Sequence, residues 1–233
     1  KIHNLKVTCS IGTNYREGSL CHECSVNNKE KAIEYRCYKN SKTLTKISNR
    51  FGDSLFYKLN NFENIKKIIV LSPFHIDYFS FLGFDRNKLV ISHNGVEIPK
   101  QYNTNPSNSK NLIYLGRLTQ DKGILDLVEA MRISNNDFHL DVYGTGALLE
   151  KLQNLNLDNV TFHGFKRKQE IFKQFLNTRA VVFPTRLYEG QGMVPVEAGA
   201  YGVPTVSPNL GGMKQLYPEE NYFMYQPFSI ENL

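Results

Sequence analysis

Short apolar runs alternate with helix-like stripes along the second half of the chain. The strand-like runs cover residues 112–115, 139–143, 160–162, 180–183, 204–207 and 222–225. Stripes with the helical repeat lie between several of them, at residues 121–131, 147–155 and 168–177. Repeated strand–helix units at this spacing predict an α/β fold with a parallel, doubly wound sheet. Ligands of such sheets bind at the carboxyl ends of the strands.

The first half shows the same alternation less regularly. Apolar residues recur every three or four positions in 41–60, which predicts a helix, and residues 73–82 predict another that ends at Gly83. The runs 67–71 and 89–92 predict strands buried on both faces. Before them, the first 40 residues have little periodicity beyond a short expected strand at 1–7.

Residues 99–111 are polar and contain two prolines, which makes this stretch the best linker candidate. A boundary near residue 105 agrees with the distribution of charge. Residues 1–100 carry 16 Lys and Arg against 9 Asp and Glu, a net charge of +7, whereas the remainder has a net charge of −1. The basic half therefore suggests an anionic partner, such as a membrane surface or a phosphate-bearing ligand.

The predicted helix at 41–60 carries basic residues beside its apolar stripe. Two interpretations remain open: an ordinary surface helix, which is favoured, or a helix that lies on an anionic membrane. No run approaches 18 apolar residues, so no membrane-spanning helix is predicted. Nucleic-acid binding is not expected, because the basic half contains no recognisable motif for it.

All four cysteines, Cys9, Cys21, Cys24 and Cys37, lie in the first 37 residues. A zinc site of four thiolates usually has two close pairs, and only Cys21 and Cys24 form one here. Free thiols are therefore favoured and no metal ligand is predicted, although a structural zinc site stays open as the alternative. Nothing in the sequence indicates secretion, which argues against disulfides. A redox motif is also disfavoured, because such a pair normally lies between a strand and the start of a helix, and Cys21 and Cys24 are not predicted to do so.

Unusual residues follow four of the predicted strands. Gly116 and Arg117 come after the first and Lys122 a few residues later, so two cations and a close backbone approach could hold a diphosphate at a helix N-terminus. The sequence YGTG follows the second strand, and FHGF, which contains His163 and Phe165, ends the third. We expect His163 to have a structural rather than a catalytic role.

The strongest signal follows the fourth strand, in the sequence PTRLYEGQGMVPVEA. Glu189 and Glu197 are separated by seven residues, and Gly190 and Gly192 leave amide groups open to a ligand. A carboxylate at Glu197, within the following helix, can bind the two hydroxyl groups of a ribose. Four such motifs in chain order, each at a strand end, predict a nucleotide-binding pocket.

In this order the motifs resemble those of the retaining GT-B glycosyltransferases that carry a Glu-x7-Glu motif, the glycosyl transferases group 1. The resemblance is close over residues 112–226 and looser over 71–74 and 91–96, and the cysteine-rich opening also looks like a segment that many members carry. It implies a GT-B fold of two Rossmann-like domains, here 1–104 and 105–233. The resemblance further implies that the first domain is incomplete and that the chain is cut at both ends.

The resemblance also implies roles for individual residues. Arg117 and Lys122, with Gly116 beside them, would neutralise the donor diphosphate, and Glu197 would bind the ribose. Glu189 and the amides of Gly192 and Met193 would hold the donor sugar. The backbone at Phe165 would contact the base, and His3 matches a histidine that members often place near the donor sugar. No Asp-x-Asp pair occurs, which agrees with a metal-independent reaction.

The expected function is transfer of a hexose, with retention, from a nucleoside diphosphate sugar to a glycan or lipid-linked glycan acceptor in polysaccharide biosynthesis. No cofactor is expected, since the nucleotide sugar is the donor substrate. The expected location is cytoplasmic and peripheral on the inner membrane face, held there by the basic half. Two alternatives stay open: a non-catalytic fragment that binds a nucleotide sugar, or a nucleotide-sugar epimerase of the same fold.

Overall fold

A computed structural model describes residues 1–26, 28–134, 137–216 and 223–233. The chain forms two compact units. Unit 1 contains Lys1–His93 together with Leu187–Gln191, and unit 2 contains Asn94–Arg186 and Gly192–Leu233. Among the described residues, no helix is long and apolar enough to cross a membrane.

Unit 2 is built on a six-stranded parallel sheet. Its strands are β5 (Asn111–Leu115), β6 (His139–Tyr143), β7 (Val160–Gly164), β8 (Ala180–Val182), β9 (Thr205–Pro208) and β10 (Phe223–Tyr225). They pair in the order β10-β9-β8-β5-β6-β7, so the chain runs outward from β5 to one edge and then returns to β8 to build the other half. This is the Rossmann strand order, and its topological switch point lies between β5 and β8.

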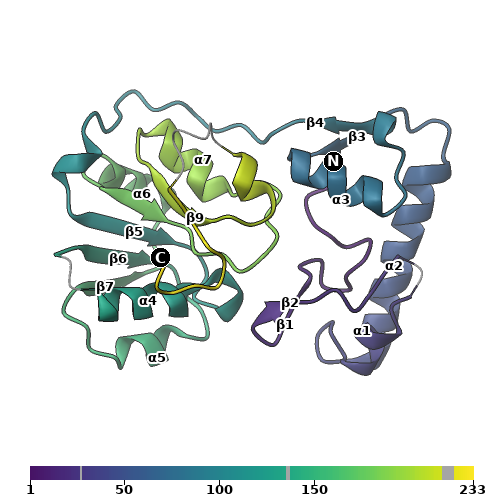
Figure 1. Ribbon diagram of the computed structural model, residues 1–233, viewed down its shortest axis with the longest axis horizontal. Coiled ribbons are helices and arrows are strands. Elements are labelled where there is room, and N and C mark those ends of the chain that lie inside the picture. Colours follow the sequence, from purple (N-terminus) through teal and green to yellow (C-terminus); the bar gives the residue numbers. More distant parts are fainter. Residues whose placement is uncertain (27, 135–136, 217–222) are drawn as a thin grey trace. The chain divides into compact units, whose positions relative to one another are not determined.

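Helices cover both faces of this sheet (Figure 1). One core joins the sheet to α4 (Ile124–Ile133) and α5 (Leu149–Gln153), and the other joins it to α6 (Lys168–Phe175) and α7 (Met193–Ala200). In β5, Tyr114 belongs to the first core and its neighbour Ile113 to the second. The central strands β5 and β8 read as apolar runs because successive side chains are buried on opposite faces.

The six predicted strands of unit 2 are confirmed to within two residues at each end, although Tyr222 lies outside the described residues. One helix start was wrong. The stripe at 121–131 predicted a helix from Asp121, but residues Gln120–Lys122 form a 3-10 turn and α4 begins at Ile124. Gly123 separates the two with φ +70°, a left-handed conformation that interrupts a helix.

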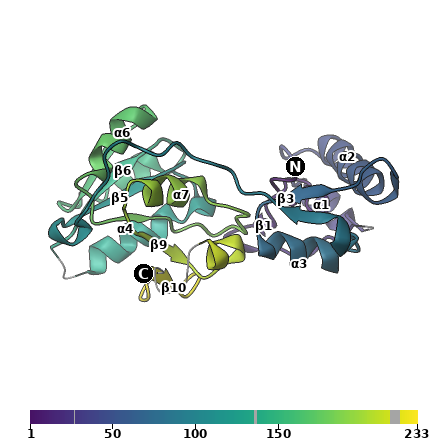
Figure 2. The same ribbon diagram turned by 90° about the horizontal axis from the view of Figure 1, so that it is seen from above.

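In unit 1 the predicted helices and the two parallel strands are confirmed. Helix α2 spans Lys42–Asn61 and α3 spans Pro73–Phe81; serine side chains, Ser41 and Ser72, cap their first turns. Strands β3 (Ile68–Val70) and β4 (Leu89–Ile91) pair in parallel, and α3 runs along them (Figure 2). Apolar residues of α2, α3 and both strands share one core.

Two expectations for unit 1 were wrong. Residues 1–7 form no strand: Ile2 donates one backbone hydrogen bond to Ile69 (2.8 Å), and the chain then turns, so that the amides of Thr8 and Cys9 both bond to the carbonyl of Leu5. The two strands are also not buried on both faces, since Ile69 and Val90 are 37% and 38% exposed in the described structure.

The remaining elements of unit 1 are short. A hairpin of β1 (Tyr15–Arg16) and β2 (Ser19–Leu20) is followed by α1 (Glu30–Glu34). The linker candidate at 99–111 is held on unit 2 rather than left free. Asn103 is buried and its side-chain amide donates to the carbonyls of Phe175 (3.1 Å) and Thr178 (2.9 Å).

Candidate functional site

Backbone hydrogen bonds connect the loops that follow β5, β6 and β7. The Gly116 amide donates to the Tyr143 carbonyl at 3.0 Å, and the Gly144 amide donates to the Gly164 carbonyl at 2.8 Å. Leu118 then donates to Thr145 at 2.9 Å. The motifs that the sequence placed at three separate strand ends therefore form one continuous backbone surface at the carboxyl edge of the sheet.

Glycine is required where two of these loops meet. A Cβ at Gly144 would lie 1.9 Å from the Gly116 carbonyl oxygen, and φ at Gly144 is +140°. A Cβ at Gly146 would lie 2.4 Å from the carbonyl oxygen of Leu118. The two glycines of the YGTG motif thus let the loops pack closely, because a side chain at either position would clash with the neighbouring backbone.

The β5–α4 loop carries the two predicted phosphate ligands. Arg117 is exposed and its guanidinium lies 3.3 Å from Asp121, while Lys122 directly precedes Gly123 and the first turn of α4. The Tyr114 hydroxyl fixes the loop by donating to the Arg117 carbonyl at 2.7 Å, and burial raises the pKa of Tyr114, which keeps this proton in place. Cations beside free amides at a helix N-terminus suit an anion.

Thr119 lies in the same loop and was not predicted. Its hydroxyl is buried and has no hydrogen-bond partner in the part of the chain that the structure describes. A buried hydroxyl without a partner is unusual in a native protein, so Thr119 is a candidate hydrogen-bond donor to a bound ligand. The threonine lies in the sequence RLTQDKG, between two predicted ligands, so its position could have suggested this role.

A buried ion pair joins the β8 end to α4. Arg186 donates two hydrogen bonds to Asp126, from Nε at 2.7 Å and from a terminal nitrogen at 2.6 Å. The Arg186 amide also donates to the Asp121 carbonyl at 3.0 Å. This pair fixes the loops on the two sides of the topological switch point to each other, and sequence reasoning missed it because the partners are 60 residues apart.

Glu197 is the predicted carboxylate of α7, and it is 7% exposed. One of its oxygens accepts a short hydrogen bond from the ammonium group of Lys168 at the start of α6. The other oxygen, Oε2, is buried and has no partner among the described residues. Lys168 itself is mostly exposed, so its ammonium can move away while the carboxylate stays fixed by its helix. The carboxylate is thus short of a hydrogen-bond donor.

The N-terminus of α7 lies at Gly192 and Met193. A Cβ at Gly192 would lie 2.9 Å from the Met213 sulfur and 3.1 Å from the Phe183 ring, so a side chain would fit only if these neighbours moved. The absence of a side chain leaves the first amides of α7, which have no partners within the helix, as donors at this end.

At the end of β7 the two motif residues have different environments. The His163 ring stacks on Tyr143 with centroids 4.6 Å apart, and its Nε2 lies 2.6 Å from an Asp141 oxygen. These contacts agree with the structural role expected for His163. Phe165 is 77% exposed, so its side chain is free to cover a ligand at this edge.

The segment Leu187–Gln191, which contains Glu189, belongs to unit 1. The Tyr188 ring stacks on Phe74 with centroids 5.3 Å apart. A Cβ at Gly190 would lie 2.1 Å from the Cε1 atom of His75, so the glycine backbone packs directly on the imidazole. Sequence reasoning missed His75, which lies in the apolar pattern of α3.

His75 is buried, and burial lowers its pKa to about 4, with a smaller contribution from nearby His3. Its Nδ1 accepts the Leu71 amide at 3.4 Å, which keeps the imidazole neutral. Unit 1 therefore carries both predicted catalytic residues, Glu189 and His3. Unit 2 carries the predicted donor ligands at the carboxyl edge of its sheet: Gly116, Arg117, Lys122, Phe165, Gly192, Met193 and Glu197.

Comparisons with known proteins place this geometry in a family. The sequence model described as "Glycosyl transferases group 1" matches residues 96–233. An uncharacterized glycosyltransferase of Methanocaldococcus jannaschii is 26% identical over 184 residues, which are 70% of this chain and 47% of the relative. The lipopolysaccharide 1,6-galactosyltransferase of Escherichia coli K12 is 28% identical over 128 residues, which are 51% and 36% of the two chains. The chain thus spans less than half the length of either relative.

Solved structures share the fold. The Anabaena protein HepE, in complex with UDP-glucose, superposes with a TM-score of 0.64 at 20% identity. The match covers 85% of this chain and 57% of HepE.

Proposed function

The chain belongs to the glycosyl transferases group 1, and on this basis we propose that its protein transfers a hexose from a nucleoside diphosphate sugar to a glycan or lipid-linked glycan, with retention. Unit 2 would bind the donor at the carboxyl edge of its sheet. The acceptor would be part of a surface polysaccharide under construction. No metal or cofactor takes part in the proposed reaction, because cations of the protein neutralise the diphosphate.

The buried, unpaired Oε2 of Glu197 is the observation that carries the proposal. A buried carboxylate oxygen without a donor is costly, and a ribose offers two adjacent hydroxyl groups that fit one carboxylate. When the ribose binds, one hydroxyl would occupy Oε2 and the other would replace Lys168 on Oε1. The exposure of Lys168 supports this exchange.

The diphosphate would lie between the N-terminus of α4 and the side chains of Arg117 and Lys122. The orphan hydroxyl of Thr119 provides one more hydrogen-bond donor to a phosphate oxygen. As the bond from the sugar to the diphosphate breaks, negative charge accumulates on the leaving phosphate. Fixed cations and helix amides stabilise that charge more than they stabilise the bound donor, which lowers the barrier.

The sugar itself would be held by Glu189 and by the amides of Gly192 and Met193, with the Phe165 region over the base. His3 would contact the donor sugar. The names of two relatives support a hexose donor and a glycan acceptor: one is a lipopolysaccharide galactosyltransferase, and HepE was solved with UDP-glucose. The basic residues of unit 1 would face the phosphate groups of a lipid-linked acceptor or of an anionic membrane.

A donor screen on the full-length protein tests the proposal. Binding of UDP-, GDP-, ADP- and dTDP-hexoses is measured by calorimetry, and release of the nucleoside diphosphate is followed with and without cell-envelope lipid extract. We expect one donor class to bind and its release to need the extract. NMR of the product should show the donor's own anomeric configuration. Failure of every donor to bind would refute the proposal.

The same screen separates the alternatives. A protein that binds a donor but releases no nucleoside diphosphate with any acceptor is a binding module. A donor whose sugar changes configuration without transfer identifies an epimerase.

A further inference from the structure

The amino-terminal segment of unit 1 contains a second candidate site, which is independent of the donor site. We propose that it binds one thiophilic divalent metal ion, of the Zn²⁺ type, through four cysteines: Cys9, Cys21, Cys24 and Cys37.

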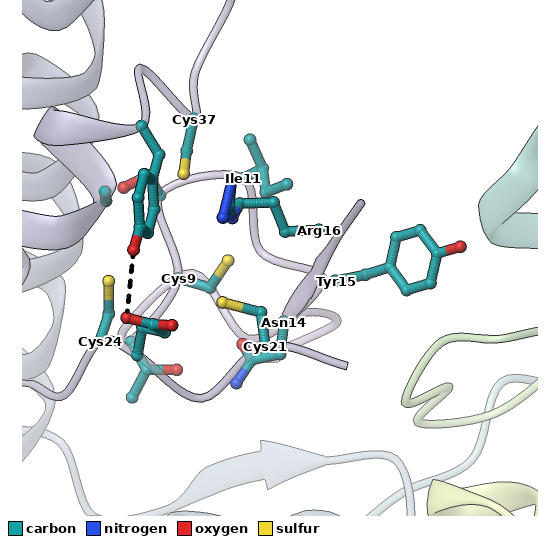
Figure 3. Close-up of a pocket in the computed structure, with 13 residues that line it drawn as sticks. Cys9, Ile11, Asn14, Tyr15, Arg16, Cys21, Cys24 and Cys37 are labelled. Atoms are coloured by element: carbon teal, nitrogen blue, oxygen red, sulfur yellow. Dashed lines mark hydrogen bonds between the residues drawn. The ribbon is translucent and has the colours of Figure 1, made fainter. Parts of the chain in front are cut away.

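The fold gathers all four cysteines of the chain around one cavity of about 20 Å³. Figure 3 shows their side chains around the same hollow, although Cys9 and Cys37 are far from the Cys21–Cys24 pair in the sequence. A volume of this size holds roughly one water molecule or one ion, and no larger ligand. The spacing along the chain disfavoured a zinc site because it showed one close pair, but the structure supplies the other two thiols.

Backbone hydrogen bonds fix the positions from which these thiols project. The Cys9 amide donates to Leu5 at 3.0 Å, the Cys21 amide to Asn14 at 2.8 Å, and the Cys37 amide to Ala32 at 3.0 Å. The β1–β2 hairpin immediately precedes Cys21, and α1 ends just before Cys37. In the described residues, no three side chains of metal-ligating types already form a group that could hold a metal. Binding would therefore require the four thiols to move closer together around the ion.

Zn²⁺ binds cysteine as the thiolate, so binding at these four residues would release the thiol protons to solvent.

The rest of the lining restricts the chemistry of the ligand. Asn14 is buried, and its Oδ1 has no hydrogen-bond partner among the described residues, which is consistent with an occupant in the cavity. Glu23, the one carboxylate of the lining, accepts a hydrogen bond from Tyr35 at 3.4 Å. The lining also supplies four sulfur atoms, and thiolate ligands select Zn²⁺ and other thiophilic ions over Mg²⁺ or Ca²⁺.

A metal here would stabilise a segment that has little regular structure. Its two strands have two residues each, and Asn14, Glu17 and Arg36 have positive φ values of 49°, 49° and 52°. Residues other than glycine adopt this conformation only when their surroundings enforce it. One ion bound by thiols from four places in the segment would enforce it, as structural zinc does in other small motifs.

The test uses the full-length protein purified without chelators from zinc-containing medium. Mass spectrometry of the metal content should find about one zinc per chain. Replacement of zinc by Co²⁺ should give the intense near-ultraviolet sulfur-to-cobalt bands of thiolate ligation. The variants Cys9→Ser and Cys37→Ser should each lose the metal, whereas Ser19→Ala, an exposed serine of the same segment, should keep it. A strong chelator should lower the melting temperature of the wild type and of Ser19→Ala.

Three results would overturn the proposal. The first is wild-type protein that stays free of metal after dialysis against Zn²⁺. The second is a Co²⁺ spectrum without sulfur bands, and the third is an intact mass that shows the cysteines paired in disulfides. Because each is measured on the wild type, misfolding of a cysteine variant cannot hide the answer. None of these results depends on donor binding or transfer, so the two proposals fail separately.

Discussion

The ion pair between Asp126 and Arg186 gives a quantitative test of how the candidate site is assembled. The two side chains are 11% and 20% exposed and share two hydrogen bonds of 2.6 and 2.7 Å. The pair joins the first turn of α4 to the loop after β8, the two sides of the topological switch point. The variant Asp126→Ala removes the carboxylate and leaves the guanidinium with little water around it.

Breaking a buried ion pair by removing one partner costs about 3–5 kcal/mol, because the remaining charge stays desolvated. The partial exposure of Arg186 places the expected loss in free energy of unfolding at the lower end, about 3 kcal/mol. For a domain of this size that corresponds to a fall of roughly 6–12 °C in melting temperature. Glu129→Ala, one turn further along α4, is the matched control. Its pair with Arg132 is exposed and screened by water, so its loss should change the free energy of unfolding far less than the loss of Asp126 does.

Urea unfolding followed by circular dichroism measures both variants. Calorimetry with the nucleotide sugar should in addition show weaker binding for Asp126→Ala alone, because the loops that present the phosphate ligands are no longer joined. Equal losses of stability in the two variants would refute the reasoning, and so would a loss below about 1 kcal/mol in Asp126→Ala, the upper range for exposed pairs.

Two further predictions concern backbone and protonation. Gly123→Ala should lower the free energy of unfolding by more than about 3 kcal/mol, because its Cβ would lie 1.7 Å from the Pro184 carbonyl oxygen. The control Gly164→Ala, which is also at positive φ but has open space around it, should lower it by about 1–2 kcal/mol, and thermal unfolding measures both. Similar losses would contradict this. The pKa of His75 is lowered to about 4, so the unfolded chain takes up the proton first. The free energy of unfolding should therefore be highest above pH 6.5 and fall by roughly 3 kcal/mol towards pH 4. Urea unfolding at several pH values should show that His75→Gln lacks this pH dependence. The same pH dependence in His75→Gln would show that His75 is not its source.

Much of unit 2 could be predicted from the sequence because its central strands are short apolar runs and helices α4, α5 and α6 each have an apolar stripe. Those are local patterns, and they also locate the strand ends where ligand residues are expected. The start of α4 was missed because Gly123 adopts its left-handed conformation where it packs against Pro184, a contact that no local pattern records. The expected strand at 1–7 failed for a related reason, since the chain turns at Leu5 after one bond to the sheet.

The candidate site was predicted in its residue types but not in its connections. Glycine, arginine and glutamate at strand ends indicate a nucleotide site from chemistry alone. The contacts that complete it join distant positions, such as Lys168 with Glu197 and Arg186 with Asp126, which are 29 and 60 residues apart. The cavity lined by the four cysteines could not be predicted for the same reason, because spacing along the chain does not reveal which thiols lie close together in the fold.

The central claim is that Glu197 holds the ribose of a nucleotide sugar, and calorimetry on Glu197→Gln tests it most directly. Glutamine keeps the shape of the side chain but removes its charge, and hydrogen bonds to charged groups contribute about 1.5–3 kcal/mol each. We predict that the dissociation constant for the donor rises by about tenfold or more. The control Glu150→Gln, at an exposed carboxylate on α5, should bind as the wild type does. An unchanged dissociation constant in Glu197→Gln would contradict the account.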